Sequence, residues 1–324
     1  MLKYIGKRLV SLIPVIFIIS VMLFGLMKIM PGDPVKLMMP PSIKSPEEYD
    51  RIYNQKRAEL GLDKSLPEQY VRWVVNTAKG DLGYSTSMNR AVKEVIATPL
   101  KNSIALNMVS VVLSFMISIP VGIRSAVKRG KFFDSFWQVF SLVGISMPTF
   151  FIGLGLIFIV SLKLDLLPAG GMPIRPDDGS LGYFFEWSNY IILPVVTLTI
   201  GSFAGTIRYV RNAMLDILAR DYIRTARSKG VKEKVVIYSH AFRNALIPVV
   251  TIVASSLVTL FGGSAITEHV FVWNGIGSVL IKALHSRDYM VILTMNMFYA
   301  VISLVANLLM DIGYALVDPR IKLD

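Results

Sequence analysis

Six long stretches without an ionisable side chain dominate the pattern of this chain. Each holds between 19 and 28 residues, which matches or exceeds the roughly 17–20 residues that an α-helix needs to cross a bilayer core of about 30 Å. The stretches are solidly apolar rather than alternating, which excludes a β-barrel. We therefore predict an all-α integral membrane protein with six transmembrane helices, over 9–27, 103–123, 135–162, 187–207, 244–267 and 289–310.

A polar insertion of 72 residues, 30–101, separates the first two predicted spans. Ser45-Pro46-Glu47-Glu48 predicts a helix start, with a serine cap, a proline in the first turn and a glutamate at the third position, and Gly61 ends this helix. A second short helix is predicted over 67–79, before Gly80. The insertion is too small to bury much surface alone, so we expect it to pack on the outer mouth of the bundle or on another protein.

Two later loops carry turn signals. The loop 163–186 is rich in Pro and Gly and is expected to be irregular. In the loop 268–288, Asn274-Gly275 predicts a turn that is followed by a short helix at the outer surface. Its longest uncharged stretch is too short to span a bilayer.

The composition agrees with a membrane protein. Hydrophobic residues make up 53% of the chain, charged residues 17%, and the mean hydropathy is +0.56, whereas a soluble domain carries about a quarter charged residues. A soluble α/β enzyme of this length is excluded. The chain has no cysteine, which excludes thiolate metal sites and cysteine catalysis. We expect the first helix to be retained, because it is longer than the apolar run of about 7–15 residues in a secretory signal and lacks a small-x-small cleavage site.

The net charge of +12 is concentrated on one predicted face. With the N-terminus in the cytoplasm, six spans leave 1–8, 124–134, 208–243 and 311–324 on the inner side. These segments hold 18 Lys and Arg against 7 Asp and Glu, while the rest of the chain holds 16 against 15. This is the positive-inside distribution. It predicts cytoplasmic N- and C-termini and removes the need for a nucleic-acid partner.

Polar and small residues recur at helical spacing in several of the predicted spans. Spacings of three, four or seven place them on single faces. Two interpretations stay open, namely close helix packing and a lined pathway for a polar solute. Our candidates for the lining of the pathway come from these faces, except for Ser146, which belongs to the third span. They are Asn107, Ser110, Ser114, Ser146, Thr251, Ser255, Thr259 and Asn296.

Signs of chemistry within the chain are missing. No Asp, Glu, Lys, Arg or His lies well inside a span, unlike in ion-coupled transporters, proton pumps and voltage sensors. The sequence has no Gly-x-x-x-x-Gly-Lys-Ser/Thr phosphate loop and no His-Glu-x-x-His, and its three histidines are scattered. We predict no catalytic residue, no metal site and no cofactor in this chain. If the protein transports a solute against a gradient, the energy must therefore come from outside this chain.

The loop 208–243 holds nine of the 18 inner basic residues and a short segment from Asp221 to Gly230 that predicts a helix ended by a glycine. Small residues at Thr225, Ala226 and Ser228 suit close docking into a groove on another protein. For the charge alone, a solvated positive-inside loop is the simpler interpretation.

The spacing around Gly230 resembles the cytoplasmic signature of ABC importer permeases, which is Glu-Ala-Ala, three residues, Gly, and later Leu/Ile-Pro. Arg224-Thr225-Ala226 stand where Glu-Ala-Ala would be, and Leu246-Ile247-Pro248 closes the motif. Two of the three leading residues depart from the general pattern, but this form is similar to the peptide and nickel branch of the family. Further motifs similar to that branch follow in order along nearly the whole chain: Pro31-Gly32-Asp33-Pro34, Gly80-Asp81-Leu82-Gly83, Ser146-Met147-Pro148, Leu167-Pro168-Ala169-Gly170-Gly171, Glu268-x-Val270-Phe271-x-Trp273-x-Gly275-x-Gly277, Arg287-Asp288 and Asp318-Pro319-Arg320.

The large insertion after the first span resembles the B-type transmembrane subunit of dipeptide, oligopeptide and nickel importers. The resemblance implies a multi-pass permease of a prokaryotic cell (inner or plasma) membrane that pairs with a sister permease as a heterodimer. It further implies two ATPase subunits, which bind ATP and Mg, an extracytoplasmic solute-binding protein, and peptide import by alternating access. The expected domains are the tail and first helix 1–29, the extracytoplasmic insertion 30–101, and the permease core 102–324 with its coupling loop 208–243.

The same resemblance implies roles for individual residues. Coupling to the ATPase is expected at Tyr222, Arg224, Thr225, Ala226, Lys229 and Gly230, and an outer gate or a contact with the binding protein at Glu268, Phe271 and Trp273. The cargo stays open between peptides, nickel chelates and other small solutes. A stand-alone channel and a membrane-embedded enzyme are rival classes, although no intramembrane catalytic pair is visible.

Overall fold

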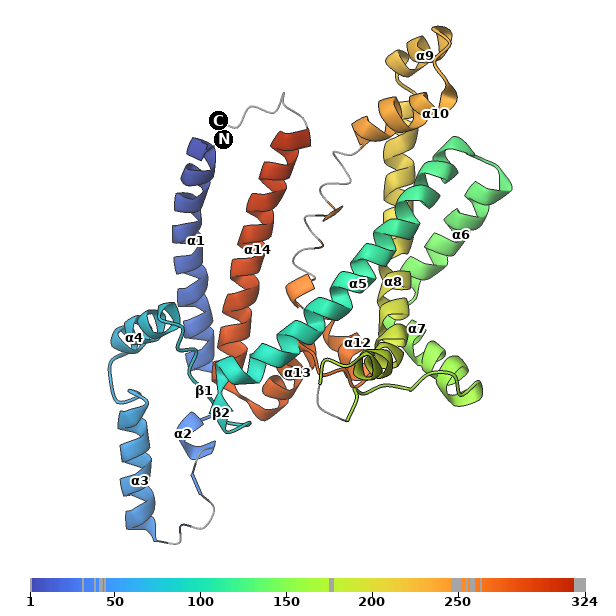
Figure 1. Cartoon of the computed structure of the whole chain (residues 1–324). Coiled ribbons are helices and arrows are strands. Elements are labelled where there is room, and N and C mark those ends of the chain that lie inside the picture. The colour runs from blue at the N-terminus through green and yellow to red at the C-terminus, as the bar shows by residue number, and fades with distance from the viewer. Residues whose placement is uncertain are drawn as a thin grey trace. The chain divides into compact units, whose positions relative to one another are not determined.

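The computed structural model describes residues 2–30, 32–37, 39–40, 43, 45–174, 178–245, 252–253, 256, 260–262 and 264–317. Within these residues the chain is almost entirely helical (Figure 1). Four helices are long and apolar enough to cross a membrane. They contain the first, second, fourth and sixth predicted spans and are α1 (Leu2–Ile29), α5 (Val92–Val127), α8 (Leu181–Leu218) and α14 (Tyr289–Val317).

The third predicted span is not one straight helix. Its residues form α6 (Phe132–Ser146), α7 (Thr149–Leu156) and the π-helix η1 (Ile157–Lys163), with a bend of 100° between α6 and α7. Pro148 has no N–H and disfavours helical backbone at the residue before it. Met147 accordingly takes an extended conformation, with φ −86° and ψ 127°. If this bent pair counts as one span, the described residues hold five, while half of the fifth predicted span, 244–267, lies outside them.

The chain divides into two compact units. One, the insertion unit, contains Gly6–Leu100 and Val279–Val301; the other, the core unit, contains Met1–Ile5, Lys101–Ser278 and Ile302–Asp324. One boundary between the units lies between Leu100 and Lys101, while the predicted permease core starts at residue 102, and the predicted division into domains stays a prediction. The first span and the insertion fall into one unit, which also includes the beginning of α14.

The insertion unit contains the two helices that the sequence predicts. They are α3 (Pro46–Glu59), whose cap Ser45 accepts a hydrogen bond from the Glu48 N–H at 3.5 Å, and α4 (Leu66–Ala78). A short helix, α2 (Pro34–Leu37), precedes them, and a small antiparallel hairpin of β1 (Tyr84–Ser85) and β2 (Arg90–Ala91) follows. The prediction of two helices within the insertion is confirmed.

Aromatic side chains fasten α4 to α1. Phe24 of α1 is buried, with its ring centroid 5.5 Å from that of Tyr70 and 5.9 Å from that of Trp73. The hydroxyls of Ser20 and Tyr70 lie 2.7 Å apart. The apolar side of α4 therefore packs on the first span, which is how the small insertion buries its surface.

The hairpin is fastened to the start of α14. The Asp288 carboxylate is fully buried and accepts hydrogen bonds from the Ser85 hydroxyl at 2.5 Å and from the hydroxyl and N–H of Ser87 at 2.8 and 3.0 Å. This network joins residues about 200 positions apart in the chain. The Val291 N–H donates to the other oxygen of Asp288 at 3.4 Å, so four donors satisfy this carboxylate without a basic partner among the described residues.

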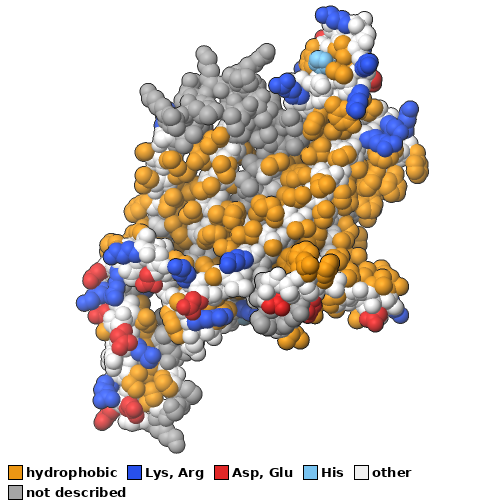
Figure 2. Space-filling view, viewed as in Figure 1, with side chains coloured by type: hydrophobic (Ala, Val, Ile, Leu, Met, Phe, Trp, Pro, Cys, Tyr) orange, Lys and Arg blue, Asp and Glu red, His pale blue; other side chains and the backbone are white. Residues whose placement is uncertain are grey.

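The core unit is built around α8. Phe140 of α6 stacks on Phe203 of α8 with ring centroids 5.7 Å apart. Gly144 allows the closest approach of these helices, since a Cβ there would lie 2.9 Å from the Cβ of Ala204. In Figure 2, hydrophobic side chains cover much of the surface of the long helices, which fits a lipid-facing surface.

Candidate functional site

The predicted coupling segment forms a separate short helix beyond the end of α8. This helix, α9, spans Asp221–Ser228, and Figure 1 shows it at the tip of α8. Gly230 has φ +72°, a backbone conformation that glycine adopts without strain, and it turns the chain toward α10 (Glu233–Val235) and the π-helix η2 (Val236–Phe242). The prediction of a helix ended by Gly230 is confirmed.

One apolar side chain anchors α9. Ile223 is 0% exposed and packs in a cluster with Val210 and Met214 of α8 and with Val236 and Ala241 of η2. Sequence reasoning missed Ile223, although it is the one aliphatic β-branched residue among the polar and basic residues of α9. The anchor gives a basic surface helix a fixed base, which a solvated loop would lack.

The opposite side of α9 is exposed. The six predicted coupling residues lie together on this helix and its C-terminal turn. Five of the six are exposed, namely Tyr222, Arg224, Thr225, Lys229 and Gly230. Ala226 is half-buried against the Ile223 cluster. Lys and Arg gather at this end of the molecule in Figure 2. The arrangement is a small, basic, protruding surface.

An ion pair connects α9 to the next helix. The guanidinium of Arg227 donates to the two carboxylate oxygens of Glu233 at 2.7 and 3.1 Å. These hydrogen bonds hold the pKa of Glu233 below its usual range. The carboxylate is therefore charged at neutral pH and keeps Arg227 bound beside the turn at Gly230. Neither member of the pair was predicted, because the pairing depends on the turn between them.

A second, more buried ion pair joins α6 to α8. Arg211 donates through Nε and a terminal nitrogen to the two oxygens of Asp134 at 2.6 and 2.7 Å, and the Gly130 N–H donates to the same carboxylate at 2.9 Å. The side chains are 4% and 15% exposed for Asp134 and Arg211. The pair lies close to the cluster that anchors α9, since Val210 belongs to that cluster. The α8 segment that leads into α9 is thus fixed to α6.

The predicted pathway residues on α5 face the inside of the subunit. Asn107, Ser110 and Ser114 are each 2–3% exposed. The Asn107 side-chain oxygen accepts a hydrogen bond from the Ser264 hydroxyl at 3.0 Å, and the Ser110 hydroxyl donates to the carbonyl of Leu106. These contacts place the α5 face against other parts of the subunit, and its role in a pathway stays a prediction.

The other pathway candidates are scattered. Ser146 is exposed at the bend between α6 and α7, and its hydroxyl donates to the Leu142 carbonyl. Asn296 is half-buried on α14, and its amide donates to the Ile292 carbonyl. Thr251, Ser255 and Thr259 lie outside the described residues. Their role in a pathway stays a prediction.

The three residues expected at an outer gate are all buried. Glu268 is 0% exposed, and Phe271 and Trp273 are 1% exposed. The Glu268 carboxylate accepts hydrogen bonds from the Ser103 hydroxyl at 2.5 Å and from the backbone N–H groups of Ser264 and Ser278 at 3.2 and 3.1 Å. Their role at an outer gate or in a contact with the binding protein stays a prediction. Glu268 belongs to α12 (Ala265–Val270) and connects Ser103 of α5 to the first turn of α13 (Ile276–Ser286) and to Ser264, the cap of α12.

The comparisons with known proteins cover nearly the whole chain. Residues 118–323 match the family described as the binding-protein-dependent transport system inner membrane component, and residues 1–107 match its N-terminal membrane component. The chain is 38% identical over 323 residues to the oligopeptide transport system permease protein AppB of Bacillus subtilis (strain 168), with 99% of this chain and 100% of that protein covered. It is 36% identical over 340 residues to the dipeptide transport system permease protein DppB of Escherichia coli (strain K12), with 99% of each covered.

A solved structure has a similar fold. A chain of the inward-facing MetNI methionine ABC transporter superposes with a TM-score of 0.53 at 19% identity, covering 69% of this chain and 96% of that chain. This likeness supports a permease fold and no more. With the family match over both parts of the chain, it leads to one conclusion: the chain belongs to the binding-protein-dependent transport system inner membrane component family and is a membrane permease of an ABC importer.

Proposed function

We propose that this chain is the B-type permease subunit of an ATP-driven importer of dipeptides and oligopeptides. The similarity to peptide permeases over 99% of the chain carries this proposal. The chain would cross the membrane six times with both termini in the cytoplasm and with the insertion on the outside, as the charge distribution favours. The nickel-chelate alternative is not favoured, since the relatives named above are peptide systems.

In this proposal α9 docks on an ATPase subunit. Its exposed face supplies polar and basic contacts, and the buried Ile223 makes it move together with the end of α8. Closure of the ATPase dimer would then push on α8 and, through Arg211 and Asp134, on α6. ATP and Mg bind to the partner subunits, so this chain hydrolyses nothing itself.

The pathway would form between this subunit and its sister permease. The buried α5 face supports this view, because a single subunit has packed most of its polar stripe internally. The exposed bend at Ser146 is a candidate for the pathway lining. An extracytoplasmic binding protein would deliver the peptide and account for most of the selection.

A substitution on the exposed face of α9 tests the coupling role. Thr225→Trp adds bulk where Thr225 is exposed and leaves the Ile223 anchor in place. In the complete transporter reconstituted in proteoliposomes, we expect peptide uptake and peptide-stimulated ATP hydrolysis to fall at least tenfold, with the subunit still inserted and assembled. Lys234→Ala, on α10, is the matched control. Unchanged coupled hydrolysis in Thr225→Trp would refute the docking role, and a complete transporter that takes up no peptide would refute the cargo.

A further inference from the structure

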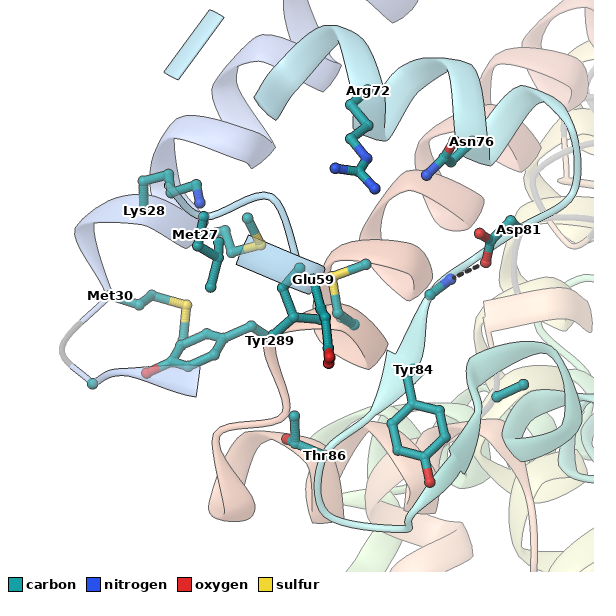
Figure 3. A pocket seen from close by; sticks show the side chains of 16 residues that line it. Met27, Lys28, Met30, Glu59, Arg72, Asn76, Asp81, Tyr84, Thr86 and Tyr289 are labelled. Atoms are coloured by element: carbon teal, nitrogen blue, oxygen red, sulfur yellow. Dashed lines mark hydrogen bonds between the residues drawn. The ribbon is translucent and has the colours of Figure 1, made fainter. Parts of the chain in front are cut away.

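The insertion unit contains a cavity of about 550 Å³ that the permease mechanism does not use. It lies between the end of α1, the end of α3, α4, the hairpin and the start of α14, all within one compact unit. The volume is in the range of about 300–1,000 Å³ that is typical of small-ligand sites. Figure 3 shows the side chains that surround it.

The apolar part of the lining is adaptable. Three methionines, Met27, Met30 and Met290, contribute to it together with Tyr84 and Tyr289. Methionine side chains are unbranched and polarisable, so they fit ligands of different shapes. Tyrosine adds a flat apolar surface with a hydroxyl at its end. Such a lining suits ligands whose side chains vary.

The polar part of the lining carries both signs of charge. Arg72 and Asn76 extend from α4 toward the cavity in Figure 3, while Asp81 lies on another side of it. The guanidinium of Arg72 has no carboxylate partner in the part of the chain that the structure describes. Among the described residues, Asp81 accepts one side-chain hydrogen bond, from the Gly83 N–H to Oδ1 at 3.0 Å, which leaves its second oxygen for a ligand. A cation and an anion are thus both available.

Two glycines with positive φ form part of the walls of the cavity. Gly32 has φ +136° and lies against the Tyr289 ring, and Gly83 has φ +81° and lies against Met290. A side chain at either glycine would be strained and would collide with the lining. Gly32 and Gly83 therefore help to shape one site, although they are far apart in the sequence.

From these observations we propose that the insertion cavity binds a short zwitterionic peptide, with its carboxylate at Arg72 and its amino group at Asp81. The side chains of the peptide would lie against the three methionines. This inference rests on the proposed peptide cargo and adds a site for it on the permease itself.

A photo-crosslinking experiment locates the ligand. The complete transporter, in lipid nanodiscs without its binding protein, is irradiated with the tripeptide alanyl-benzoylphenylalanyl-alanine, because the benzophenone group reacts preferentially with methionine. Mass spectrometry should find adducts on Met27, Met30 or Met290. Excess trialanine should suppress them. Adducts confined to other parts of the transporter would overturn the proposal.

Modified competitors test the two charged contacts. Trialanine amide, which lacks the carboxylate, and N-acetyl-trialanine, which lacks the amino group, should each compete about tenfold less well than trialanine, as expected for the loss of one charged hydrogen bond. Arg72→Gln should remove the difference between trialanine and its amide, and Asp81→Asn the difference between trialanine and its acetylated form. Arg51→Gln, on the exposed surface of α3, is the control and should change neither.

Two further outcomes would reject the site. Equal competition by all three peptides would show that the termini are not recognised. Labelling of the methionines that occurs only when the binding protein is present would assign the cavity to that protein. Peptide uptake by the complete transporter is measured in parallel. If the transporter imports trialanine but these methionines are not labelled, the cavity site is rejected and the proposed function stands.

Discussion

At the scale of single residues, buried carboxylates organise this protein. Glu268 accepts three hydrogen bonds at 2.5–3.2 Å while fully buried, and a Cβ at Gly275 would collide with its carboxylate. Glu268→Gln replaces one acceptor oxygen with a donor and leaves a backbone N–H or the Ser103 hydroxyl without a partner. We expect a loss of about 1–3 kcal/mol in unfolding free energy, seen as a lower Tm of the purified subunit in detergent.

The control for this prediction is Glu94→Gln, because Glu94 is exposed in the first turn of α5. The same chemical change at an exposed position should leave the Tm within error. Equal Tm values for wild type and Glu268→Gln would mean that the hydrogen bonds of Glu268 do not hold the turn before α13.

At the scale of elements, α6 and α8 act as one piece because Asp134 and Arg211 join them in a buried, bidentate pair. Removing one partner of such a pair leaves an uncompensated buried charge and costs about 3–5 kcal/mol. Asp134→Asn and Arg211→Gln should each lower the Tm and weaken peptide-stimulated ATP hydrolysis, since the end of α8 that carries α9 becomes less well fixed.

A double-mutant cycle checks this prediction. The variant with both substitutions should lose clearly less stability than the sum of the single losses, because neither charge is then left alone. Additive losses would show that the two side chains act independently.

At the scale of the whole molecule, the topology is open to a direct test because the chain has no cysteine. We expect Asn54→Cys, exposed on α3, to react with a membrane-impermeant maleimide in intact cells. Ser228→Cys, exposed on α9, should react only after the membrane is made permeable. The unsubstituted chain is the blank, and the opposite labelling pattern would reverse the proposed orientation.

Local signals in the sequence predicted much of the local structure, although not the 100° bend between α6 and α7. Runs of uncharged residues predicted α1, α5, α8 and α14, because apolar length alone decides whether a helix can span a membrane. The cap at Ser45 and the glycine at 230 predicted the limits of α3 and α9, since capping depends on a few neighbouring residues. Resemblance in ordered motifs also identified the family.

Tertiary structure alone decided which residues meet. Periodicity placed Asn107, Ser110 and Ser114 on one face of α5, but it did not tell that this face would be buried within the subunit. Asp134 and Arg211 lie 77 positions apart, and the cavity combines side chains from five segments of the insertion unit. Such contacts depend on how elements pack, which no local pattern of the chain encodes, so the sequence determined the helices and the family while the fold determined the sites between them.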